Sequence, residues 1–109
     1  MKSSGYHLGR AVEYRVADRL RADGYEIQRA ASSKGIADLI AIKPGQVLFI
    51  SVKRTALPGP AERRELVRVA RMLPGVGVPV IARGRTLERI TDDGTNPRAR
   101  VPFLTDLED

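Results

Sequence analysis

The pattern of hydrophobic and polar residues in the first half of the chain predicts one helix followed by three strands. Apolar residues recur at helical spacing over residues 3–22, and Gly24 predicts the end of this helix. Residues 25–30 alternate in polarity and predict a short strand, whereas 37–42 and 46–54 are the clearest strand patterns in the chain. The apolar face of the helix is expected to consist of Leu8, Ala11, Val12, Val16, Ala17 and Leu20.

The second half of the chain predicts a second helix and at least one more strand. The helix covers residues 60–73, because Pro60 suits a first helical turn, and its inward residues are Leu66, Val69, Ala70 and Leu73. Residues 78–82 predict a strand in which Pro79 lies at the start or at a sheet edge, and 86–90 predict a possible last strand. Residues 92–109 are rich in turn residues and end acidic, so we expect a partly mobile tail of the same domain.

This order of elements predicts an α/β protein with a small mixed β-sheet flanked by helices. The first three strands are joined by short connections, which favour antiparallel pairing. The helix between the third and fourth strands allows a parallel crossover.

Length and composition restrict the classes of protein that fit. The chain of 109 residues predicts one domain, and the absence of cysteine excludes disulfides, thiolate metal sites and cysteine nucleophiles. No stretch approaches the roughly 20 apolar residues of a membrane span. We therefore expect a cytoplasmic protein, or a phage protein that acts in the host cytoplasm.

The charge of the chain favours a polyanionic partner. The net charge is +6, and 15 of the 19 basic residues are arginine. Residues 1–91 carry 17 basic and 8 acidic residues, a net charge of +9. A basic surface of this kind suits nucleic acid, and the planar guanidinium suits phosphate oxygens. The alternative is that the charge serves solubility and reflects a genome rich in arginine codons.

The most informative chemistry lies on the two central strands. A tight turn at Pro44 and Gly45 places Asp38 opposite Ser51, with Lys53 one step further on the same face. The register is open to a slip of one residue, since this turn sequence favours a type II geometry that suits short hairpins poorly. A buried carboxylate and ammonium are costly unless they are paired or used. The two interpretations are a functional site and a structural salt bridge between Asp38 and Lys53.

The stretch Gly9–Arg54 resembles the archaeal-type Holliday junction resolvases, a branch of the PD-(D/E)XK nuclease superfamily. The matching segments are "GRAVEYRVADRLRADGY", "EIQRAASSKGIADLIAI" and "GQVLFISVKR". Small VRR-type nucleases of phage and of DNA repair are similar in the same region. The resemblance implies a restriction-endonuclease-like core and a nuclease-like domain over residues 1–91.

The resemblance also implies a reaction and a set of site residues. The reaction is hydrolysis of phosphodiesters in branched DNA, with Mg²⁺ or Mn²⁺ and a homodimer that places two sites on two strands. The implied catalytic residues are Glu13, Asp38, Ser51 and Lys53, and the implied metal ligands are Glu13, Asp38 and the backbone carbonyl of Val52. Lys53 would orient or deprotonate the attacking water, or stabilise developing negative charge. We expect Glu13, Asp38 and Lys53 to meet at one rim of the sheet.

Two positions depart from the pattern of that family. Ala37 replaces a proline, and Ser51 replaces an acid that would be a metal ligand. A neutral hydroxyl is a weaker ligand for Mg²⁺ than a carboxylate. Three interpretations remain: Ser51 binds a metal through water, Glu62 or Glu65 of the second helix supplies the acid, or catalysis is lost and only DNA binding remains.

Basic and hydroxyl residues near this rim are candidates for DNA contacts. We expect contacts to phosphates more than to bases, and hence recognition of shape. The candidates are Arg10, Arg29, Ser32, Ser33, Lys34, Arg54, Arg63 and Arg64. The alternatives to a nuclease are a DNA-binding module without activity and a basic protein-binding or ribosome-associated domain.

Overall fold

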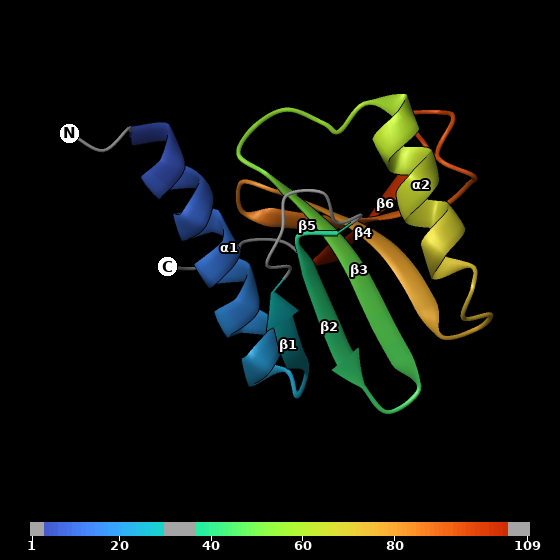
Figure 1. Cartoon of the computed structure of the whole chain (residues 1–109), viewed down its shortest axis with the longest axis horizontal. Coiled ribbons are helices and arrows are strands. Elements are labelled where there is room, and N and C mark those ends of the chain that lie inside the picture. Colours follow the sequence, from blue (N-terminus) through green and yellow to red (C-terminus); the bar gives the residue numbers. More distant parts are fainter. Residues whose placement is uncertain (1–3, 30–36, 105–109) are drawn as a thin grey trace.

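The computed structural model describes residues 4–29 and 37–104, and the side chains from residue 11 onward within those ranges. In this part of the chain, two helices and a six-stranded sheet confirm the predicted α/β class (Figure 1). Neither helix combines the length and the apolar composition that a membrane span needs. The elements are α1 (Ser4–Ala22), β1 (Glu26–Arg29), β2 (Leu39–Lys43), β3 (Gln46–Lys53), α2 (Pro60–Ala70), β4 (Gly77–Arg83), β5 (Thr86–Ile90) and β6 (Arg100–Leu104).

The six strands lie side by side in chain order. All neighbouring pairs are antiparallel except β3 and β4, which are parallel and joined through α2. In the β2–β3 hairpin, Leu39 pairs with Ile50 and Lys43 with Gln46, and Gly45 has a φ of 81° in the turn. This is the register expected from the sequence, and continuing it by one residue places Asp38 opposite Ser51.

The alternation of side chains along β3 divides the core into two parts. On one face, α1 packs Val12, Val16 and Leu20 with Leu48 and Ile50 of β3. On the other face, the helix α2 packs Leu66, Val67 and Ala70 with strand residues that include Phe49 and Ile81. Ser51 and Lys53 share the face of Phe49, so both point toward the α2 side of the sheet.

The helices differ from the predicted ones in three details. Ala11 is exposed rather than part of the buried face of α1. Helix α2 ends at Ala70 instead of residue 73, so Leu73 lies beyond the helix and is 40% exposed. Val67 takes the buried position, while Val69 is only partly buried. The buried residues Arg63, Leu66, Val67 and Ala70 recur at helical spacing, so the inward face of α2 is rotated toward Val67 relative to the predicted face.

The prediction for Pro79 agrees with the structure, whereas β6 was not predicted. Pro79 lies within β4, which has a neighbour on each side, although β5 pairs with β4 only from Val80 onward. Pro79 therefore has one neighbouring strand, β3, which explains how the sheet accommodates it. Arg100–Leu104, expected to belong to a turn-rich and partly mobile tail, pairs with β5 as the last strand of the sheet.

Candidate active site

Asp38 lies just before β2 and is fixed against β3 by two hydrogen bonds. Its main-chain N–H donates to the carbonyl oxygen of Ile50 over 2.8 Å. Its side-chain Oδ2 accepts a hydrogen bond from the N–H of Val52 over 2.7 Å. The backbone of β3 thus holds the carboxylate in place, next to the strand that carries Ser51 and Lys53.

A carboxylate from α2 joins Ser51 and Lys53. The Ser51 hydroxyl donates to Glu62 Oε2 over 2.9 Å, and Lys53 Nζ lies 3.3 Å from Glu62 Oε1. Ser51 is 1% exposed, whereas the side chains of Lys53 and Glu62 keep 35% and 39% of their surface exposed. The buried Ser51 hydroxyl therefore has a hydrogen-bond acceptor, whereas Lys53 and Glu62 remain partly accessible to solvent.

The electrostatic environment of Asp38 is unfavourable for its charge. Burial is the largest effect, and it raises the pKa of the Asp38 carboxyl above its usual value. The hydrogen bond from Val52 and the nearby Lys53 oppose this rise, whereas the charges of Glu13 and Glu62 add to it. The charges of these two glutamates thus repel that of Asp38, and a nearby cation would offset this repulsion.

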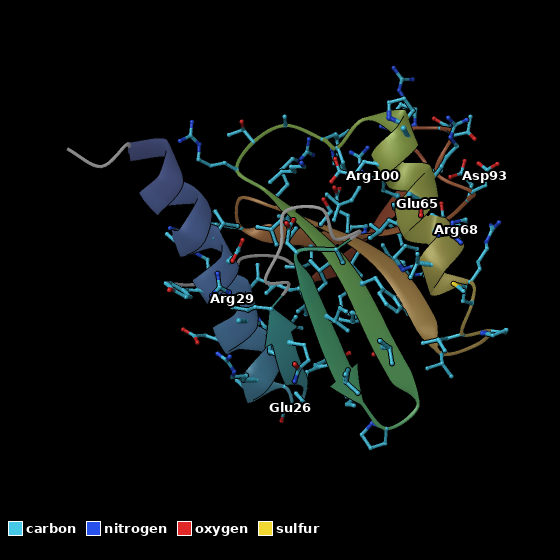
Figure 2. All side chains as sticks on the ribbon, viewed as in Figure 1. Glu26, Arg29, Glu65, Arg68, Asp93 and Arg100 are labelled. Carbon is cyan, nitrogen blue, oxygen red and sulfur yellow. The ribbon has the colours of Figure 1, made fainter. Side chains whose placement is uncertain are left out.

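Glu13 reaches this region from the other side of the sheet, because α1 covers the face opposite α2. Its Oε1 accepts hydrogen bonds from Arg29, over 2.9 Å from Nη2 and 3.3 Å from Nε. The Arg29 guanidinium also lies 5.8 Å from the ring centre of Tyr14, and Figure 2 shows Arg29 beside α1. Glu13 thus acts on Asp38 at a distance, while its direct partner is Arg29.

The donor atoms at this rim suit a hard divalent cation. Asp38, Ser51 and Glu62 offer only oxygen ligands, and the neighbouring negative charges that raise the pKa of Asp38 are those a cation would offset. Within the described residues, however, no three acidic, histidine or cysteine side chains are arranged to hold a metal ion. Mg²⁺ is commonly bound by one or two carboxylates plus waters and substrate phosphate. The residues present fit such an open site, but not a complete protein cage.

The structure distinguishes between the two acids that the sequence offered from the second helix. Glu65 is paired with Arg68 on α2, with 2.9 Å between its Oε1 and Nε of the arginine, and Figure 2 shows the two together. This hydrogen bond lowers the pKa of the Glu65 carboxyl. Of these two acids, it is Glu62 that meets Ser51 and Lys53.

The candidate DNA contacts fall into several groups. Arg54 and Arg64 are exposed near the end of β3 and on α2. Arg29 is 42% exposed and paired with Glu13. The side chain of Arg10 and the residues Ser32, Ser33 and Lys34 lie outside what the structure describes.

Arg63 was expected on the DNA-binding surface, and the structure contradicts this. The residue is 5% exposed, and its guanidinium donates to the carbonyl oxygens of Pro58, Gly94 and Thr95 over 2.8, 3.0 and 3.2 Å. A count of charges along the sequence cannot show that a single arginine turns inward. We therefore do not assign a DNA contact to Arg63.

Comparison with known proteins agrees with the α/β fold. The family model of the archaeal Holliday junction resolvase (Hjc) matches residues 4–83, which extend from α1 through β4 and include Glu13, Asp38, Ser51, Lys53 and Glu62. A search among curated proteins finds no match. Since the family model covers most of the chain, this protein belongs to the archaeal Holliday junction resolvase family.

Proposed function

We propose that the protein is a metal-dependent endonuclease that hydrolyses phosphodiesters in branched DNA, with Glu62 in the role of the acid that Ser51 lacks. The observation that carries this proposal is the bridge from Glu62 to both Ser51 and Lys53, next to an Asp38 whose pKa is raised. Family membership supports a resolvase-like nuclease. The contacts of Glu62 with Ser51 and Lys53 support a site in which the second acid comes from α2 instead of β3.

Each residue of the proposed site has a distinct task. Asp38 and Glu62 would hold Mg²⁺ or Mn²⁺, with the Val52 carbonyl as a further ligand. The bound cation supplies a Lewis acid for the phosphoryl oxygen and acidifies a bound water. Ser51 fixes one oxygen of Glu62 through its hydrogen bond, and Lys53, close to the other, is placed to orient the attacking water or offset charge on the phosphate.

Exposed arginines would bind the phosphates on either side of the cut. Arg54 follows Lys53 directly, and Arg64 projects from the first turns of α2. Arg29 would bind a phosphate only by exchanging its contact with Glu13, which would free that carboxylate to approach the cation. We propose a homodimer on a four-way junction, acting in the cytoplasm.

A DNA-binding module without catalysis is the second candidate. The pairing of Glu13 with Arg29 favours it, since this pairing leaves two carboxylates and a hydroxyl at the rim. Cleavage separates the two candidates. Salt dependence separates both from a basic protein-binding domain, because neutralising about 6–10 phosphates costs roughly 10³–10⁵ in affinity between 50 and 200 mM salt.

The proposal is tested with a labelled four-way junction, a flap and a linear duplex, each with and without Mg²⁺ or Mn²⁺. We expect cleavage of the junction only with metal, and loss of cleavage in Asp38→Asn. The cleavage rate should fall by more than the roughly 10- to 100-fold that is typical when a residue hydrogen-bonded to a metal ligand is removed. Junction binding should remain or improve. Unchanged turnover in Asp38→Asn would exclude the proposed metal assignment.

A further inference from the structure

Arg63 is a buried cation whose three acceptors are neutral carbonyls of two separate segments. Pro58 precedes α2, whereas Gly94 and Thr95 follow β5. An arginine buried in this way holds segments together through several hydrogen bonds with a fixed geometry. It therefore connects the first turn of α2 to the chain that follows β5.

The segment Asp92–Asn96 is shaped to receive Arg63. The Asp92 carboxylate accepts hydrogen bonds from the N–H groups of Gly94 and Asn96, over 2.8 and 3.3 Å. Gly94 has a φ of +94°, and a Cβ there would lie 2.8 Å from the carbonyl carbon of Arg63. Figure 1 shows this orange segment passing beside α2. The close approach means that only glycine fits without moving α2 or the segment.

The first turn of α2 has no side-chain cap of its own. Gly59 precedes the helix and makes no side-chain capping hydrogen bond. Glu62, which meets Ser51 and Lys53, is the residue directly before Arg63. Whatever fixes the backbone at Arg63 also fixes the point from which the Glu62 side chain extends.

We infer that Arg63 and the segment Asp92–Asn96 form a clamp that positions Glu62. The segment lies beyond residues 4–83, the range that the family model matches. The inference rests on the proposed function, since it assigns Glu62 to the site. Arg63 is a positioning residue that acts through its neighbour and touches neither DNA nor metal. The site is thus complete only when the segment Asp92–Asn96 is packed on α2.

Three variants test the clamp without altering Glu62. Gly94→Ala displaces the segment, and Arg63→Lys keeps the charge but cannot reproduce the three-way hydrogen bonding of the guanidinium. We expect the single-turnover cleavage rate at saturating protein to fall about 10- to 100-fold, with junction affinity within about threefold of wild type. Mn²⁺ affinity, measured by calorimetry, should weaken over the same range. Arg63→Met should be worse than Arg63→Lys.

Val80→Ala is the matched control, because Val80 is fully buried on the α1 face and away from the clamp. At a temperature where all variants are folded, it should cleave like wild type despite its lower stability. The inference is overturned if Gly94→Ala and Arg63→Lys keep wild-type cleavage and Mn²⁺ affinity, or if Val80→Ala loses as much. Glu62→Gln serves as the reference: if it also cleaves normally, the proposed role of Glu62 fails rather than the clamp alone. If wild type does not cleave, Mn²⁺ affinity still decides on the clamp.

Discussion

At the level of single residues, the presence of Glu62 explains why position 51 carries a neutral serine. A hydroxyl that is 1% exposed needs an acceptor, and the Glu62 carboxylate supplies one. Lys53 offsets part of the charge that this carboxylate brings. An acid at position 51 would place a second buried negative charge next to Glu62. A neutral residue at position 51 avoids this repulsion.

The raised pKa of Asp38 predicts that its ionised carboxylate lowers the stability of the folded protein. An acid whose folded pKa exceeds its unfolded value binds more protons when folded, so stability is lost as the pH rises from the unfolded pKa through the folded one. Asp38→Asn removes that cost and keeps an oxygen for the Val52 N–H. We therefore expect its melting temperature to rise by a few degrees at neutral pH, and the gain to vanish below the unfolded pKa of about 3.9.

Asp18→Asn is the control for this comparison, since Asp18 is an exposed partner of Arg21 on α1. Its melting temperature should stay close to wild type at both pH values. A melting temperature of Asp38→Asn that falls at neutral pH would show that the ionised carboxylate stabilises the fold, against our interpretation.

The strand residues of the proposed site were more predictable from the sequence than its helix residues. Alternation along the β2–β3 hairpin was enough to bring Asp38, Ser51 and Lys53 together. Glu62 and Glu65 lie three residues apart on one helix, so spacing cannot say which reaches the sheet. That choice depends on how α2 is rotated against β3, which is set by the packing of the core.

At the level of elements, α2 is held at both of its ends. Arg63 fixes the first turn, and Gly77 meets the last. A Cβ on Gly77 would lie 2.1 Å from the carbonyl oxygen of Ala70, and the Gly77 N–H donates to Leu73 over 2.8 Å. The helix can therefore approach the start of β4 only because that position lacks a side chain.

Gly77→Ala is expected to destabilise the protein by about 1–3 kcal/mol or more, because the clash is with backbone that cannot move aside easily. Urea denaturation measures this change. Gly59→Ser is the control: nothing lies within 4 Å of a Cβ there, and serine is a good capping residue, so its stability should equal or slightly exceed that of wild type. A Gly77→Ala variant as stable as wild type would contradict the close packing of α2 on β4.

The elements themselves were mostly predictable from periodicity. Both helices and the first five strands lie within a few residues of their expected bounds. β6 was not predicted, because its five residues include Pro102, follow a stretch rich in turn residues and show no strict alternation of buried and exposed positions. Its pairing with β5 also contains a register shift at Leu87 and Glu88, which no local pattern reveals.

At the level of the whole molecule, the sheet separates the two helices that bring acids toward Asp38. Glu13 comes from the α1 side and Glu62 from the α2 side, and both raise the pKa of Asp38. Length, the α/β class and the basic character followed from the sequence alone. The division of the acids between two layers did not, because it depends on the path of α2 across the sheet between β3 and β4.

The measurement that tests the account most directly is the cleavage rate of a four-way junction in Mg²⁺ by Glu62→Gln, compared with Glu65→Gln. Both variants remove one carboxylate from α2, but only the first removes the partner of Ser51 and Lys53. We predict that Glu62→Gln binds the junction yet cleaves it about 100-fold more slowly, while Glu65→Gln cleaves like wild type. Wild-type cleavage by Glu62→Gln would contradict the account.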